Sequence, residues 1–166
     1  SSCTVAMTLD QNASVTFVQG FRALTFTQNG SGSVSSNPAG ISTTADGQTD
    51  TGVFNDGTSV TLTASPAAGW QVGSWSGCTS GGGTSTTCTV SMTSDRSASV
   101  TFVQASRTLT LTQNGAGSVS SNPAGISTTA DGQTDTGGFN HGTSVRLTAT
   151  PASGYRKGTR LISTHR

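Results

Sequence analysis

The sequence predicts an all-β protein made of tandem small antiparallel β-sandwich or β-grasp-like repeat modules of about 85 residues. The composition is the first reason: the 166 residues include 26 Ser and 31 Thr, no Glu and one Lys. Strong helix formers are therefore scarce, while residues that suit strands are abundant. The other two reasons are the alternation of apolar and hydroxyl residues and an internal repeat, which favour ordered β-structure over a mucin-like stalk.

The repeat has a constant offset of 85 positions. Residues 24–69 recur as residues 109–154 with seven differences in 46 positions, and residues 3–19 recur as residues 88–104. The chain thus begins near the end of one repeat unit and closes part-way through another. The predicted organisation is 1–23, the C-terminal strands of a split repeat; 24–108, a complete repeat module; and 109–166, the N-terminal part of a further repeat with a divergent basic tail.

Strands are predicted where apolar residues occupy every second position. Such alternation occurs in 59–64, 89–92, 97–102 and 108–112. Each segment then has one apolar face and one hydroxyl face, as a half-solvated antiparallel sheet requires.

Turn signals separate these segments and give six or seven short strands per repeat. Asn29-Gly30 and Asn114-Gly115 have the composition of type I′ hairpins. Asn37-Pro38-Ala39-Gly40 is a turn with a fixed φ, and Asn55-Asp56-Gly57 leads into another strand. Trp70, Trp75, Phe54 and Phe102 are the expected bulky core residues of the complete repeat.

Cys78 and Cys88 flank a glycine-rich loop that has no metal-ligand spacing. A disulfide between them suits a small secreted domain and contributes on the order of 3 kcal/mol. Cys3 aligns with Cys88, but its partner position falls before the first residue, and Cys78 plus 85 is Ser163. Cys3 is therefore odd: upstream residues have been removed, or it is free, or it bonds another molecule.

The residue order around these elements resembles a known bacterial family. LTFTQNGSGSVSSNPAGI, then the segment from Phe54 through Trp75 to Cys78, then CTVSMTSDRSASVTF, is similar to the divergent internalin-type B-repeats. That resemblance implies tandem modules of large secreted or surface-attached proteins, with a spacer, adhesive or assembly role. Members commonly carry a cysteine pair after the PAGI element, whereas here Ile41 is followed by Ser42 and Thr43.

Several classes of function are disfavoured. A formal net charge of +1 gives no electrostatic footprint for nucleic acid, and no apolar run is long enough to span a membrane. Catalysis finds no support, because Glu is absent and neither His141 nor His165 recurs in the complete repeat. No cofactor is expected.

Two groups of residues are candidate ligand sites. Asp46 and Asp50, repeated as Asp131 and Asp135, offer oxygen atoms to calcium, but the EF-hand spacing is missing, so turn-forming aspartates are the favoured interpretation. Trp70 and Trp75 are either a glycan-stacking platform or core residues, and core is favoured.

The tail does not continue the repeat. The repeat predicts a second tryptophan near position 160, but the sequence there runs from Gly154-Tyr155 to Arg160 without one. Five of the last eleven residues are basic or His: Arg156, Lys157, Arg160, His165 and Arg166. An unrelated or truncated end is favoured over a basic anchor for an acidic surface.

The phase of the repeat leads to a functional hypothesis. A half-repeat exposes an apolar face and unpaired edges, which can be completed within the chain, by another chain head to tail, or by flanking sequence. We therefore predict a non-enzymatic, extracellular structural protein that forms a surface stalk or filament. Its partners are copies of itself or flanking repeats of a longer chain. The alternative is an adhesive or carbohydrate-binding accessory module of a larger secreted bacterial protein, with surface glycans as partners.

Overall fold

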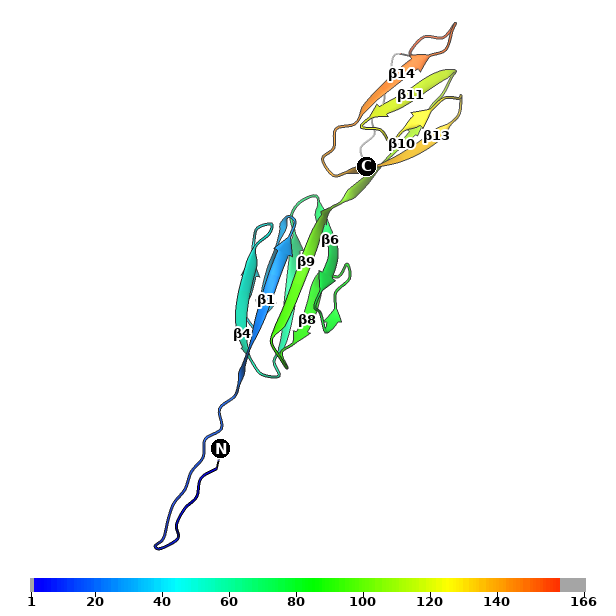
Figure 1. Ribbon diagram of the computed structural model, residues 1–166. Helices are drawn as coiled ribbons and strands as arrows, with labels where there is room; N and C mark the ends of the chain where they lie inside the picture. The colour runs from blue at the N-terminus through cyan, green and yellow to red at the C-terminus, as the bar shows by residue number, and fades with distance from the viewer. Residues whose placement is uncertain (1, 159–166) are drawn as a thin grey trace.

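The computed structural model describes residues 2–158, and all the regular structure in this range is β-strand. Figure 1 shows two β-units arranged end to end and an extended N-terminal segment that projects beyond the first of them. We call these the first repeat (residues 21–105), the second repeat (residues 106–158) and the arm (residues 2–19). The all-β prediction is confirmed. No helix in the described range is long and apolar enough to cross a membrane.

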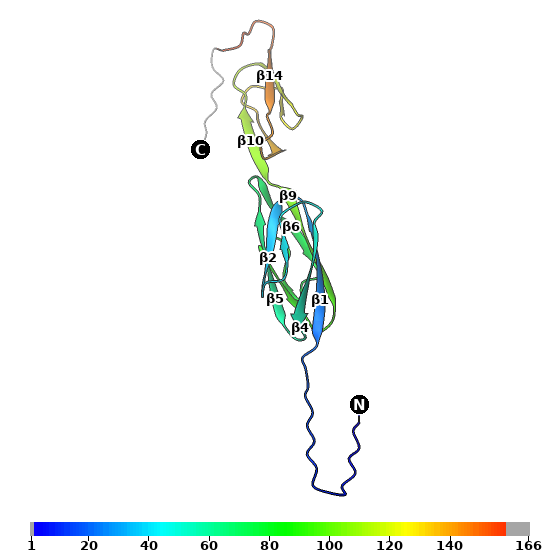
Figure 2. The same ribbon diagram turned by 90° about the vertical axis from the view of Figure 1, so that its left-hand side faces the viewer.

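The first repeat contains nine strands in two sheets. The strands are β1 (Phe21–Asn29), β2 (Gly32–Asn37), β3 (Ser42–Thr43), β4 (Thr49–Asn55), β5 (Ser59–Pro66), β6 (Trp70–Ser76), β7 (Ser80–Gly81), β8 (Thr87–Ser91) and β9 (Arg96–Gln104). One sheet has the order β4-β1-β9-β6, and the other has the order β3-β2-β5-β8-β7. Of the two architectures expected from sequence, the structure is the sandwich, and its two layers are visible in Figure 2.

The predicted alternation places the core between these sheets. Leu24 and Phe26 of β1 are buried, and so are the alternating apolar residues of β5, β8 and β9. Thr and Ser between them face outward, because successive side chains of a strand point to opposite faces. Phe54 and Phe102 are core residues, whereas Trp70 and Trp75 are only partly buried and pack against the core.

One local expectation was wrong. Asn29-Gly30 does not form a hairpin: β1 lies in one sheet and β2 in the other, so this turn carries the chain between layers. The turn at Asn55-Asp56-Gly57 leads into β5 as expected, and it too connects strands in different sheets. Gly30 and Gly57 have positive φ angles of 83° and 82°, and the strands on either side of each turn bury their apolar faces on opposite sides of one core.

One strand pair is parallel, which the antiparallel expectation missed. β9 crosses from the sheet of β8 and lies beside β1 in parallel, with Leu24 opposite Arg96 and Asn29 opposite Thr101. Its other edge pairs with β6 in the antiparallel sense. β9 is therefore a central strand, supported on both sides by residues far away in sequence.

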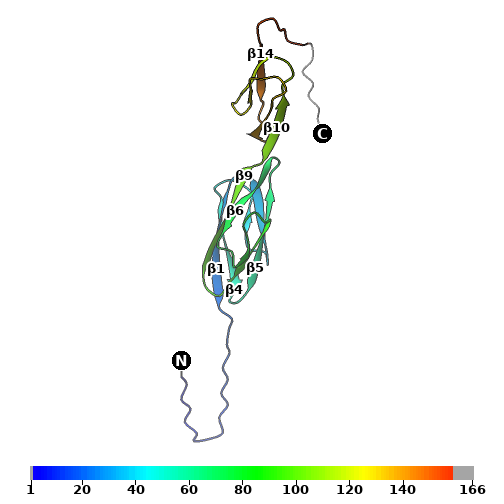
Figure 3. The same cartoon turned by 90° about the vertical axis from the view of Figure 1, so that its right-hand side faces the viewer.

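The second repeat has five strands in the described range. They are β10 (Ser106–Thr112), β11 (Gly117–Asn122), β12 (Ser127–Thr128), β13 (Thr134–Asn140) and β14 (Arg146–Pro151). Among the described strands, β10 pairs with β13 alone, and β11 lies between β12 and β14. These strands repeat β1 to β5 of the first repeat. Figure 3 shows the thinner body that results.

The two repeats join through a single residue between strands. β9 ends at Gln104 and β10 begins at Ser106. Ala105 donates its N–H to the Gly69 carbonyl at 2.8 Å, and its own carbonyl accepts from the N–H of His141 at 2.8 Å. The ring of His141 lies against Gly69, where a Cβ would collide with it. The junction therefore has defined contacts from both repeats.

Candidate functional site

The arm carries the sequence of β8 and β9 but forms no strand in the structure. Residues 3–19 and 88–104 share 13 of 17 positions. The Phe17 side chain is 89% exposed, whereas its counterpart Phe102 is 2% exposed. The reason is competition for partners: in the first repeat, the edges that this sequence would occupy on β1, β5 and β6 are already taken by β8 and β9. The prediction that residues 1–23 form strands is therefore wrong for 2–20.

In the first repeat, β8 and β9 close both layers of the sandwich. β8 pairs with β5 in the antiparallel sense, with Leu62 opposite Cys88, and β9 covers β1. The following Met92 exchanges backbone hydrogen bonds with the β4–β5 turn: its N–H donates to Thr58, and its carbonyl accepts from Gly57. These two strands therefore turn the open sheets into a closed core.

The second repeat lacks this cover among the described residues. In the part of the chain that the structure describes, β10 has no partner on the edge that corresponds to the β9 edge of β1, and β14 has none on the edge that corresponds to the β8 edge of β5. Leu109, Leu111 and Leu147 are consequently half-buried, whereas Leu24, Phe26 and Leu62 at the same positions of the first repeat are fully buried. We call this uncovered side, from β10 to β14, the open face. Unpaired strand edges of this kind are sites where another strand can pair.

A pair of glycines shapes the seat of Phe102. A Cβ on Gly32 would lie 2.7 Å from two atoms of the Phe102 ring, and a Cβ on Gly30 would collide with the Phe102 backbone. Only glycine leaves this space, since real Cβ atoms do not approach so closely. We call Gly30 and Gly32 the glycine socket. Gly115 and Gly117 repeat it in the second repeat, where a Cβ on Gly115 would meet nothing within 4 Å.

A buried amide holds the socket in place. Gln28 donates from Nε2 to the carbonyls of Gly30 and Gly32 at 3.2 and 2.9 Å, and its Oε1 accepts from the Thr43 hydroxyl at 2.8 Å. Both side chains are fully buried. Every polar atom of the amide is thereby satisfied, as burial requires. The group fixes the turn that carries the chain from one sheet to the other.

The second repeat contains the same network. Gln113 donates to the carbonyls of Gly115 and Gly117 at 3.0 and 2.9 Å and accepts from Thr128 at 2.7 Å. The socket is therefore held by hydrogen bonds without an aromatic ring beside Gly115. Sequence reasoning missed Gln28 and Gln113. The available signal was a glutamine in the buried phase of an apolar alternation, two residues after Phe26 and again after Leu111.

The structure contains the predicted disulfide. Cys78 and Cys88 are bonded, with their Cα atoms 5.5 Å apart, and Cys88 is fully buried. The bridge ties the loop after β6 to β8. Cys3, the residue of the arm that aligns with Cys88, is free and exposed.

The two tryptophans have different surroundings. Trp75 packs on Phe26, with ring centroids 6.1 Å apart, and its indole N–H donates to the Ser85 carbonyl at 2.8 Å. A β-bulge between Val72 and Ser74 shifts the alternation by one residue, so that Trp75 shares the inner face with Val72. Trp75 is therefore a structural residue in this repeat.

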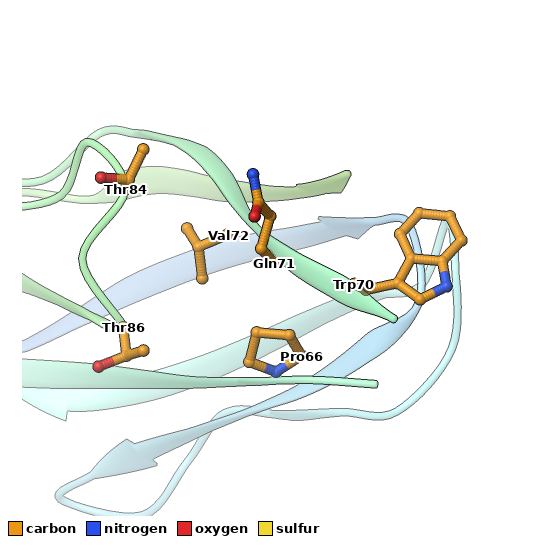
Figure 4. Close-up of a pocket in the computed structure, with 6 residues that line it drawn as sticks. All are labelled: Pro66, Trp70, Gln71, Val72, Thr84 and Thr86. Carbon is orange, nitrogen blue, oxygen red and sulfur yellow. The ribbon is translucent and has the colours of Figure 1, made fainter. Parts of the chain in front are cut away.

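Trp70 lies at the rim of an open depression of about 440 Å³. Figure 4 shows its indole at the outer end of β6, with Val72 and Gln71 further along the strand and Thr84 and Thr86 on the facing loop. Pro66 closes the lower side. The depression combines one aromatic ring with hydroxyl and amide groups.

The four aspartates weighed for calcium bind backbone amides instead. Asp46 accepts from the N–H of Gly30, and Asp131 accepts from that of Gly115. Asp50 accepts from Ser42 and Thr51, each at 2.8 Å. No cluster of three metal-ligating side chains occurs within residues 2–158. These contacts agree with the favoured interpretation of turn-forming aspartates.

Asp135 makes the same contacts as Asp50. It accepts from the N–H of Ser127 at 2.7 Å and from that of Thr136 at 2.8 Å. These two hydrogen bonds, Ser127 first, lower the pKa of the Asp135 carboxyl below its ordinary value, because they stabilise the charged form.

Position 56 distinguishes the beginnings of the two repeats. Arg22 donates from Nε to the Asp56 carboxylate at 2.7 Å on the surface, and this hydrogen bond raises the pKa of Arg22. The second repeat has Arg107 and His141 at these positions. His141 lies against Gly69 instead, so the substitution places an imidazole at the junction.

The basic tail is only partly described. Arg156 and Lys157 are exposed and lie outside the strands. Arg160, His165 and Arg166 lie outside the described residues. The favoured interpretation, an unrelated or truncated end, and the alternative of a basic anchor therefore both stay untested.

The comparison with protein families finds a match. The family model for the divergent InlB B-repeat domain matches twice, at residues 22–106 and 107–156, which together cover most of the chain. No curated protein and no solved structure showed significant similarity to the chain. The two matches meet at the junction between the first and second repeats. The chain therefore belongs to the divergent InlB B-repeat family, an extracellular kind of bacterial repeat domain.

Proposed function

We propose that this protein is a non-enzymatic structural repeat protein that extends a stalk or filament outside the bacterial cell by β-strand complementation between repeats. The carrying observation is the open face of the second repeat, where, within residues 2–158, β10 and β14 lack the cover that β9 and β8 give to β1 and β5. Burial of the half-buried leucines there supplies the driving force, since apolar burial contributes roughly 25 cal/mol per Å².

Three further features support an extended array. The repeats stand end to end, and their junction has backbone hydrogen bonds. The arm exposes apolar residues, and its sequence is a near copy of β8 and β9, which close the sandwich of the first repeat. The disulfide suits the oxidising environment outside the cell.

Size-exclusion chromatography with light scattering on the 166-residue chain tests the proposal. We expect a molar mass that rises with protein concentration, and rod-like particles by electron microscopy. A compact monomer at every concentration would contradict self-assembly and leave flanking repeats of a longer chain as the completing partner.

The depression beside Trp70 supports a second candidate function, a glycan-binding accessory module. A partly buried aromatic ring beside hydroxyl and amide groups is a suitable surface for stacking a sugar. A glycan array with the wild-type chain and Trp70→Ala tests it. Binding that is lost in a variant with an unchanged circular dichroism spectrum supports the module, whereas no binding by the wild type contradicts it.

A further inference from the structure

We propose that the arm of one chain fills the open face of a second chain in the register that β8 and β9 hold in the first repeat, with Phe17 seated in the glycine socket of Gly115 and Gly117. This inference rests on the proposed function and specifies its partner: a second copy of this chain, bound through residues 2–19.

The pairing of β1 with β9 in the first repeat gives the register of the arm beside β10. β9 lies parallel to β1, with Leu24 opposite Arg96 and Asn29 opposite Thr101. Subtracting 85 from the β9 numbers and adding 85 to the β1 numbers places residues 11–16 beside residues 109–114, also in parallel. Ala13 and Val15 then point into the core as Ala98 and Val100 do.

The same 85-residue shift gives the register of the arm in the second sheet. β8 pairs with β5 in the antiparallel sense, with Val60 opposite Val90 and Leu62 opposite Cys88. Val5 of the arm then lies opposite Val145, and Cys3 lies opposite Leu147. One arm thus covers both layers, as the continuous segment from β8 to β9 does.

The backbone of the acceptor is already arranged for this segment. Met92 exchanges two hydrogen bonds with Gly57 and Thr58, at 2.9 and 2.8 Å. The turn at Gly142 and Thr143 repeats that geometry, with a φ of 82° at both Gly57 and Gly142. Met7 is the corresponding residue of the arm, and its side chain is 73% exposed.

Phe17 is the expected anchor. Its counterpart Phe102 packs on the Gly32 face of the socket, and Gln113 holds the second socket with the same hydrogen bonds as Gln28. Gly117 differs locally, with a φ of 156°, and a Cβ there would meet the Thr150 carbonyl rather than a ring. Seating Phe17 therefore involves an adjustment at Gly117 toward the conformation of Gly32.

The register requires two chains in the end-to-end arrangement. Thr16 would lie beside Asn114, and five residues further on Phe21 must begin β1, a reach of at most about 18 Å. Within one chain, the path from Asn114 back to Phe21 runs along seven residues of β10 and nine of β1. At about 3.3 Å per residue these strands span roughly 50 Å. The arm cannot fill the open face of its own chain without breaking the junction.

Between two chains the connection is short and has a precedent in the structure. The Ala105 carbonyl accepts from His141 at 2.8 Å, and the Gly20 carbonyl accepts from Asp56 at 2.8 Å. The beginning of the first repeat is therefore built like the beginning of the second. A seated arm would lead through Gly20 into the next first repeat as Gln104 leads through Ala105 into β10.

Cysteine cross-linking between two variants tests the register. The donor carries Cys3→Ser and Thr4→Cys, and the acceptor carries Cys3→Ser and Arg146→Cys, because Thr89 lies opposite Thr61 in the first repeat. The control acceptor carries Cys3→Ser and Thr150→Cys, four residues away on the same strand. We expect a mixed disulfide dimer with Arg146→Cys at about ten times the control yield, since bridging requires nearby Cα atoms. Equal yields from both acceptors would overturn the register.

Phe17→Ala tests the anchor, and Val18→Ala is its matched control. Both side chains are nearly fully exposed in the arm, but Val18 aligns with Val103, which stays 38% exposed beside Phe102. We expect Phe17→Ala to raise the concentration needed for assembly about a hundredfold. Val18→Ala leaves it within a few-fold of the wild type.

The outcomes separate this inference from the proposed function. Assembly that is unchanged by Phe17→Ala, with no preferred cross-link, overturns the seated arm. The chains would then assemble through a different interface, and the filament proposal would be retained. A wild-type chain that is monomeric at all concentrations overturns the seated arm and the self-assembly in the proposed function, and leaves flanking repeats of a longer chain as the completing partner. Register-specific cross-links together with loss of assembly in Phe17→Ala support the inference.

Discussion

The two repeats of this chain have nearly the same sequence and different cores. Residues 24–69 and 109–154 differ at seven positions, and the strands form at the same places. Yet Leu24 is fully buried, whereas Leu109 at the same position is half-buried. The difference arises from β8 and β9, which begin more than 60 residues after Leu24. Local sequence thus determines the strand, and distant partners determine whether its apolar face is buried.

The arm shows the converse. Residues 13–19 and 98–104 are identical, but one copy is a central strand and the other is exposed and extended. Whether a segment forms a paired strand therefore depends on its residues and also on whether a neighbouring strand has an unpaired edge.

The largest expected effect contrasts the two copies of the phenylalanine. Phe102→Ala removes a buried ring from the glycine socket and should lower the free energy of unfolding of the first repeat by about 3–5 kcal/mol. Phe17→Ala should change it by less than about 0.5 kcal/mol in dilute protein, because that ring is exposed. Urea denaturation followed by tryptophan fluorescence measures both. Equal effects would mean that the arm is packed in the monomer.

The cysteines allow a second comparison between the first repeat and the arm. Replacing both Cys78 and Cys88 by Ala releases a bridge between residues ten positions apart and should lower the free energy of unfolding by about 3 kcal/mol. Cys3→Ala is the control and should have no effect, since Cys3 is exposed and free. Thermal unfolding followed by circular dichroism makes the comparison. An unchanged melting temperature in the double variant would show that β8 is held without the bridge.

The buried glutamines should be equivalent in the two repeats. Gln28→Leu leaves the Thr43 hydroxyl and two glycine carbonyls without their partner, at a cost of about 1–3 kcal/mol. Gln113→Leu should cost a similar amount in the second repeat. Hydrogen exchange of β2 and of β11 measures each effect separately. A loss of protection confined to one repeat would show that the network stabilises only a closed sandwich.

The smallest expected effect is a dependence on pH. The folded state lowers the pKa of Asp135, so its contribution is present above the unfolded pKa of about 3.9 and is lost as pH falls through the folded value. Protection of β12 and β13 should therefore decrease in acid. Asp135→Asn should show less dependence on pH in this range. A steeper acid transition in the variant would contradict the assignment.

Much of the fold follows from the sequence because its signals are local and repeated. Alternation located the buried residues of β5, β8 and β9, and the cysteine spacing located the bridge. The route of the chain between layers was not predictable from Asn29-Gly30, because a glycine with positive φ serves a hairpin and a sheet-to-sheet connection equally well. The parallel β1–β9 pair depends on contacts across more than 70 residues, which no local pattern encodes.

The candidate site was predicted in outline only. The repeat phase indicated an incomplete unit, but the glycine socket and its glutamine were missed because each looks ordinary in isolation. Gly30 was assigned to a hairpin, and Gln28 received no role. Their role emerges only when Phe102 is placed over Gly32.

The most direct test of an arm that completes another chain is hydrogen exchange of the wild-type protein at low and high concentration. We expect the amides of residues 11–19 and of β10 to gain protection together as the molar mass rises, while β1 stays protected throughout. An arm that exchanges freely at every concentration, in protein whose mass has increased, would contradict the account.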